Sequence, residues 1–299
     1  PAFQSYADSS YTDAITKFQV YLSKFPDGRF VNETYYFLGN SFYKTKDTLN
    51  ALIYFEKFLE TPTNVYSESA ALRTAAYYYS NKSYELAYKF YEKLEQVASK
   101  PTTVFSAKLG LMRCAFLIDD FAKAIEYSKF VLESGGITTQ LKIEGMYSSG
   151  ISNYRFGNFE EAFSPLEWVV KNTTTAIGSE AKFTLAEIYF KQVKYEQADI
   201  EIKSLLKMKP SYNYWVAKAL MVRTTLIRLR KPRPRGKSES WSSKRGNSSR
   251  PESSFAGASV TTHRGLPIPI ISAQPVSRAM FIASKRRSPP VTIKGMDTS

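Results

Sequence analysis

A short pattern recurs along the first three-quarters of the sequence and limits the folds that are open to it. A residue that is usually aromatic is followed three positions later by an alanine, and four positions after that by another large or medium side chain. Successive alanines are 37, 36, 37, 38 and 36 residues apart. A fixed period of this size indicates stacked supersecondary units. The six alanines are Ala14, Ala51, Ala87, Ala124, Ala162 and Ala198.

Each period is expected to form two amphipathic helices joined by a short turn, because apolar side chains recur at i, i+3, i+4 and i+7. Residues 179–210 show this arrangement most fully. Leu185 and Tyr189 share one face of the expected first helix, and Ala198 lies on the inner face of the second. Two helix backbones can approach closely only where the side chain between them is small, which explains the recurring alanine.

These positions resemble the tetratricopeptide repeat (TPR). The first helix of that family's repeat has a Leu-Gly or Leu-Ala pair, with an aromatic residue three positions after the Gly or Ala. The second helix has an alanine after the turn, an aromatic residue four positions later and a closing proline. The resemblance covers residues 2–222. The matching positions are Leu38, Gly39 and Phe42; Leu185, Ala186 and Tyr189; Ala14, Phe18 and Pro26; Ala51 and Phe55; Ala87 and Tyr91; and Ala198, Ile202 and Pro210.

The resemblance implies an all-α, right-handed superhelix of about six antiparallel helix pairs over residues 1–222. We expect a truncated first repeat, five full repeats and the start of a seventh at Tyr212. The period is longer than the usual ~34 residues. Pro165 falls inside an expected second helix and should kink it or delay its start.

In this family the first helices line a concave groove that holds a segment of a partner. The resemblance therefore implies an aromatic ladder at one equivalent position of five successive repeats. Rigid rings anchor peptide interfaces at small entropic cost. The alternative is that each ring simply packs against the next repeat. The ladder consists of Tyr43, Tyr79, Phe116, Tyr154 and Phe190.

Cationic side chains lie beside these rings in the sequence. Lys and Arg could bind a partner's carboxylates through charge-assisted hydrogen bonds, so an acidic or C-terminal-carboxylate ligand is the hypothesis. A solvated helix face is the alternative, since surface Lys and Arg need no partner. The residues are Lys44, Arg113, Arg155 and Lys191.

The positive charge of the chain is concentrated at its C-terminal end. Of the net charge of +14, residues 1–222 contribute +1, from 25 Lys and Arg against 24 Asp and Glu, and residues 223–299 contribute +13, from 16 against 3. All 21 Tyr precede Arg223, whereas eight of the 14 Pro follow it. A segment of this composition is expected to be a disordered basic tail. The abrupt change also fits a shifted reading frame, and both readings stay open.

The composition gives enzyme chemistry little support. The only histidine is His263, so the repeats lack the usual base for a Ser or Cys nucleophile. One Cys and one His exclude the usual structural zinc sites. Cys114, the only cysteine, is expected to be a small buried thiol. We therefore expect a non-catalytic scaffold with no cofactor and no metal.

The expected partner is a protein or peptide, with self-association through open solenoid ends as a further option. An adaptor whose basic tail docks nucleic acid or an acidic surface is the alternative function, and it holds only if the tail is genuine. No apolar run approaches the ~20 residues of a membrane span. Tyr- and Phe-rich repeats of this length are similar to those of large bacterial cell-envelope proteins. That resemblance implies a periplasmic or outer-membrane-associated setting, with the cytoplasm as the alternative.

Overall fold

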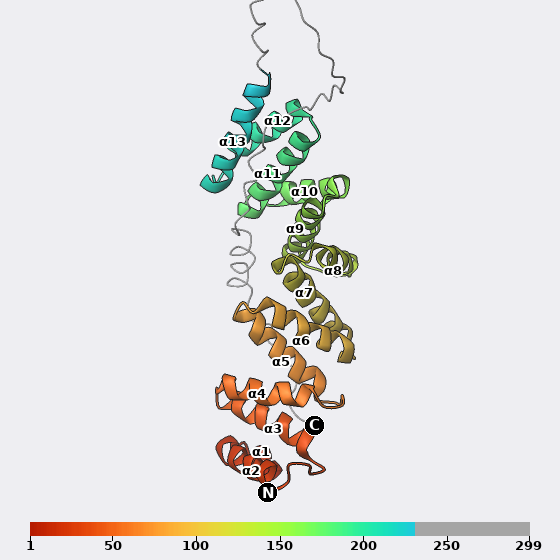
Figure 1. The fold of residues 1–299 in the computed structure, drawn as a ribbon, viewed down its shortest axis with the longest axis vertical. Helices are drawn as coiled ribbons and strands as arrows, with labels where there is room; N and C mark the ends of the chain where they lie inside the picture. Colours follow the sequence, from red (N-terminus) through yellow and green to blue (C-terminus); the bar gives the residue numbers. More distant parts are fainter. Residues whose placement is uncertain (231–299) are drawn as a thin grey trace, which may run out of the picture. The chain divides into compact units, whose positions relative to one another are not determined.

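The computed structural model describes residues 1–230, and these residues form thirteen α-helices (Figure 1). The expectation of an all-α fold is confirmed for this part of the chain. The helices are α1 (Ala2–Ala7), α2 (Tyr11–Lys24), α3 (Val31–Lys44), α4 (Thr48–Leu59), α5 (Ser67–Ser80), α6 (Tyr84–Val97), α7 (Pro101–Leu117), α8 (Phe121–Glu133), α9 (Thr139–Phe156), α10 (Phe159–Asn172), α11 (Ala176–Lys191), α12 (Tyr195–Leu206) and α13 (Asn213–Arg230).

The chain divides into two compact units, residues 1–223 and residues 224–299. Only residues 224–230 of the second unit, which form the end of α13, are among those described. The helix thus continues beyond the expected boundary at Val222, and inside the first unit Arg223 donates a 3.3 Å hydrogen bond to Asp199 of α12. Residues 231–299 of the expected tail, including His263, lie outside the described residues.

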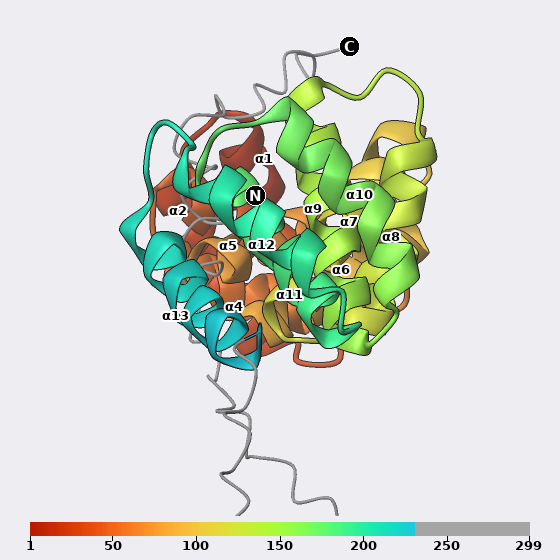
Figure 2. The ribbon, with the colours of Figure 1, turned by 90° about the horizontal axis from the view of Figure 1, so that it is seen from above.

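Helices of the first unit pack in chain order. Each odd-numbered helix packs against the even-numbered helix that follows it, and each even-numbered helix packs against the next pair, from α1 to α12. We call the odd-numbered helices first helices and the even-numbered ones second helices. First helices also contact one another directly, α1 with α3, α7 with α9 and α9 with α11. Figure 2 looks along this array, with α11 and α12 in front of the earlier pairs.

The recurring alanines hold the helices of each pair together. Each of the six is at most 1% exposed and lies near the start of a second helix. Gly39 of α3 shows how closely the backbones approach, because a Cβ atom at this position would lie 2.9 Å from the ring of Phe55 in α4. Small residues at these sites therefore determine the spacing within a pair.

Pro165 lies inside α10, yet α10 begins at Phe159, three residues before Ala162. The other second helices also begin three residues before their alanine, so the expected late start does not occur. The proline removes one backbone donor, whose acceptor would be the carbonyl of Glu161. Glu161 is exposed in the first turn of α10, where water can satisfy that carbonyl.

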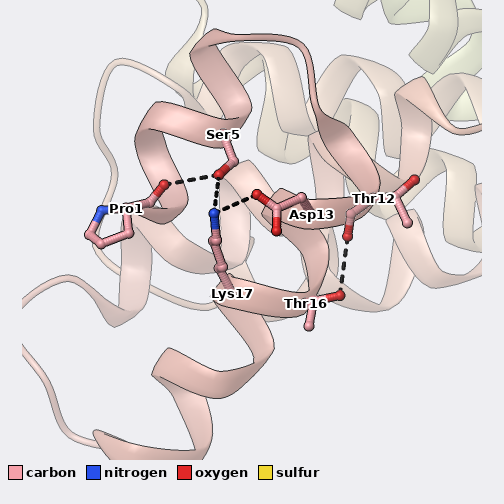
Figure 3. A network of polar contacts seen from close by, with 6 residues as sticks. All are labelled: Pro1, Ser5, Thr12, Asp13, Thr16 and Lys17. Atoms are coloured by element: carbon pink, nitrogen blue, oxygen red, sulfur yellow. Dashed lines mark hydrogen bonds and ion pairs between the residues drawn. The ribbon is translucent and has the colours of Figure 1, made fainter.

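Polar contacts attach the six-residue helix α1 to α2 (Figure 3). The Lys17 ammonium lies 2.8 Å from the Ser5 hydroxyl oxygen and 2.5 Å from a carboxylate oxygen of Asp13. The Ser5 hydroxyl donates in turn to the carbonyl of Pro1 at 3.1 Å. The hydrogen bond from Lys17 holds the pKa of Asp13 below its usual value. The network orders the first pair, although its ion pair is exposed and contributes little free energy.

Candidate binding face on the first helices

Polar contacts link the first helices one to the next. They join α1 to α3 and α3 to α5, then α7 to α9, and finally α9 to α11. Side chains in contact across this series lie about one repeat apart in sequence. We call the surface formed by these helices the first-helix face.

Arg73 of α5 is held at the N-terminal end of this face. Its guanidinium donates a 2.7 Å hydrogen bond to the side-chain oxygen of Asn40, and the amide group of Asn40 donates to the Tyr6 hydroxyl. The same guanidinium lies 4.4 Å from the centre of the Tyr43 ring. We call these four residues the Arg73 cluster. Within residues 1–230, no carboxylate forms an ion pair with Arg73, so its charge is held in place and left uncompensated.

Arg113 of α7 has a carboxylate partner. Its Nε atom lies 2.5 Å from one oxygen of Glu144 in α9, and its Nη2 atom lies 2.8 Å from the other. Burial lowers the pKa of Arg113, but the hydrogen bonds and the charge of Glu144 outweigh burial and raise the pKa above its usual value. This two-pronged contact neutralises the guanidinium. The predicted cation at this position therefore adds no net charge to the face.

Tyr154 of α9 contacts two residues of α11, Glu187 and Lys191. The Tyr154 hydroxyl donates to a carboxylate oxygen of Glu187 at 3.0 Å, and the Lys191 ammonium lies 4.5 Å from the centre of the Tyr154 ring. Burial raises the pKa of Glu187, while the hydrogen bond from Tyr154 opposes that rise. Phe190 packs against Tyr195, with 5.7 Å between ring centres.

The predicted aromatic ladder is unevenly exposed. Tyr43 is 46% exposed, and Tyr154 and Phe190 are half-buried. Tyr79 and Phe116 are only 6% and 5% exposed, so the packing alternative describes these two rings. The predicted cations Lys44, Arg155 and Lys191 all lie at the surface.

The sequence analysis missed two residues of this face, Arg73 and Glu144. Arg73 lies six residues before the predicted ladder position Tyr79, and Glu144 lies ten before Tyr154. A comparison of all charged residues at equivalent positions of the first helices could have found both. Their contacts cross from one repeat to the next, which a search for one groove position per repeat does not detect.

Other kinds of site find no support within residues 1–230. No three His, Cys, Asp or Glu side chains there lie close enough together to hold a metal ion. Cys114 is fully buried. None of the described helices is both long enough and apolar enough to cross a membrane.

Comparison with known proteins adds a family match at the N-terminal end. Residues 1–71 match the family of YfiO, an outer membrane lipoprotein. Among curated proteins, none matches the sequence.

Several solved structures are similar. YrrB, described as a TPR protein with an unusual peptide-binding site, is 15% identical with a TM-score of 0.49, over 69% of this chain and 97% of its own. A tetratricopeptide repeat protein from Parabacteroides merdae ATCC 43184 is 14% identical with a TM-score of 0.40, over 75% and 96%. The TPR domain of P58(IPK) is 17% identical with a TM-score of 0.32, over 75% and 62%.

The repeat itself identifies the fold. Six second helices each place a buried alanine against the preceding first helix at a spacing of 36 to 38 residues. By its stacked helix pairs and the residues that pack them, the described part of the chain has the fold of a tetratricopeptide-repeat array.

Proposed function

We propose that this scaffold binds a segment of a partner protein along the first-helix face, with a carboxylate of the partner on Arg73. The observation that carries the proposal is the uncompensated charge of Arg73. The hydrogen bond to Asn40 and the ring of Tyr43 fix the guanidinium before any ligand arrives. A fixed guanidinium binds a carboxylate in two-pronged geometry with little further loss of entropy.

The surroundings of Arg73 suit a peptide. The exposed ring of Tyr43 offers a flat apolar surface beside the charge. Lys44, next to Tyr43 in α3, is exposed and adds a second positive charge. A segment that carries Asp, Glu or a free C-terminus beside an apolar side chain fits this combination.

The test uses two sets of synthetic twelve-residue peptides that differ only at the C-terminus, one with a free carboxylate and one amidated. Binding to the full chain is measured by fluorescence polarisation. Hydrogen bonds to charged groups contribute about 1.5–3 kcal/mol, so Arg73→Gln should weaken the binding of carboxylate peptides about 10- to 100-fold. Lys171→Gln, which removes one charge from the exposed surface of α10, is the matched control. Equal binding by Arg73→Gln and the parent chain would refute the carboxylate site.

We also propose that the protein works at the cell envelope, since its first 71 residues match an outer membrane lipoprotein family. Fractionation of cells that express the full gene would test this, and recovery only in the cytoplasm would contradict it. The alternative role of the basic tail concerns residues outside the described part of the chain.

A further inference from the structure

Glu180 of α11 occupies the same position in its repeat as Glu144 does in α9. Each lies ten residues before its ladder position, Phe190 and Tyr154 respectively. Glu144 binds the guanidinium of Arg113, which lies three residues before the ladder position of the preceding first helix. In the next repeat that place is taken by Ile151. The carboxylate is thus repeated along the array, but its arginine is not.

The carboxylate of Glu180 is buried without an ion-pair partner. The residue is 4% exposed, and its Oε2 atom accepts no hydrogen bond from the described residues. Burial of a carboxylate without a counter-ion costs free energy, because the group loses its hydration and gains no cation in return. Burial raises the pKa of Glu180 to about 7, although the neighbouring Tyr147 side chain and the positive charges of Arg155 and Lys218 oppose that rise.

The groups around Glu180 come from three helices. Tyr147 and Arg155 belong to α9, Lys218 belongs to α13, and Glu187 lies two turns further along α11 and raises the pKa of Glu180. Neither cation forms an ion pair with Glu180 within residues 1–230. The Lys218 ammonium instead lies over aromatic rings, 5.0 Å from Tyr214 and 5.3 Å from Trp215.

We propose that Glu180 receives the guanidinium of an arginine side chain of the bound partner, as Glu144 receives Arg113. The internal pair shows that a carboxylate at this position of a first helix binds a fork of two N–H donors. In this pair the Glu144 side chain is 8% exposed, so a carboxylate at this position binds the fork in a buried environment. Arginine matches this geometry better than lysine does, since its donors lie in one plane.

This inference rests on the proposed function, because it assumes that the partner lies along the first-helix face. It extends that function by predicting a ligand with two charges of opposite sign. A carboxylate binds near α3 and α5, and an arginine binds near α9 and α11. The two charges also set the direction of the bound segment.

The experiment uses the full chain, labelled with ¹³C at the glutamate side-chain carboxyl carbons, and N-acetyl-arginine amide as the probe. The Glu180 resonance, assigned by its loss in Glu180→Gln, should shift saturably as the probe is added. Only the ionised carboxylate binds the cation, so affinity should rise about tenfold from pH 6 to pH 8 for a pKa near 7. N-acetyl-lysine amide should bind more weakly.

Two variants and one control test the assignment. Glu180→Gln should abolish binding of the probe, whereas Glu167→Gln, on the exposed surface of α10, should leave it unchanged. Ile151→Arg should supply the missing guanidinium from within the chain, lower the pKa of Glu180 and prevent the probe from binding. Circular dichroism confirms that each variant is folded.

Probe binding that persists in Glu180→Gln, or a pKa of Glu180 that Ile151→Arg leaves near 7, would overturn the inference. The Arg73→Gln variant separates the two proposals. It should weaken carboxylate peptides and leave the arginine probe unaffected. Failure of the arginine site alone therefore leaves the carboxylate site standing.

Discussion

The pair formed by Arg113 and Glu144 allows a quantitative prediction about how the first helices are held together. Glu144→Gln keeps the shape of the side chain but removes its charge, which leaves the guanidinium of Arg113 without a counter-ion. Removal of one partner from a buried ion pair costs about 3–5 kcal/mol. The Arg113 side chain is 25% exposed, so water compensates part of this loss, and the new amide oxygen still accepts one hydrogen bond. We expect a loss of about 2–3 kcal/mol.

The double variant Arg113→Leu with Glu144→Leu removes both charges and should be closer to the parent chain than Glu144→Gln is. Replacement of a buried ion pair by apolar residues is often neutral, because neither charge then has to be desolvated. Urea denaturation followed by circular dichroism measures the loss. Hydrogen exchange locates it, because in a repeat protein a weakened contact should open α7 and α9 before distant repeats. A change below about 0.5 kcal/mol in Glu144→Gln, or a double variant as unstable as the sum of its single variants, would refute this reasoning.

Three further predictions concern single positions. Gly39→Ala should lower stability by about 1–2 kcal/mol, because overpacking against Phe55 outweighs the gain in helix propensity. Gly135→Ala, with open space around it, is the control, and equal melting temperatures of the two variants would contradict the prediction. Pro165→Ala should raise stability by about 1 kcal/mol, since it restores a backbone donor in α10, and calorimetry would show a lower melting temperature if the proline ring were instead needed for packing. Burial raises the pKa of Glu180 from 4.5 to about 7, so the folded state binds this proton more tightly than the unfolded state does and loses up to about 3 kcal/mol of stability as pH rises from 4.5 past 7. Glu180→Gln should remove this loss in denaturation curves at pH 5 and pH 8, and an unchanged pH dependence would show that another group causes it.

The sequence predicts the helix pairs well because their cause is local and repeated. A methyl group is needed wherever two backbones approach, so Ala14 and its five equivalents mark each pair directly. The exposure of the ladder rings depends instead on which side chains the neighbouring helices place over them. Tyr43 and Tyr79 occupy equivalent positions, yet the first is exposed under Arg73 and the second is buried against Tyr84. The position of a ladder ring within its repeat therefore does not predict how exposed the ring is.

Contacts between charged residues were harder to predict than the helices for a related reason. Arg113 and Glu144 are 31 residues apart, whereas Asn40 and Arg73 are 33 apart, so no single offset identifies partners. The offset depends on how far successive first helices are displaced along one another. The sequence pattern shows that both residues of a pair lie on first helices, but it does not determine that displacement.

The charged residues of the first-helix face differ in where their partner comes from, and this difference separates structural from binding roles. Arg113 and Glu144 satisfy one another, so they stabilise the array and leave nothing for a ligand. Arg73 is held by neutral groups alone, and Glu180 has a buried oxygen without a donor within residues 1–230. Each of these two residues has the charge of one half of a pair that the chain itself completes at α7 and α9. A partner that supplies both missing halves would gain two charge-assisted contacts at positions that are already ordered, which is why we expect recognition at these two residues.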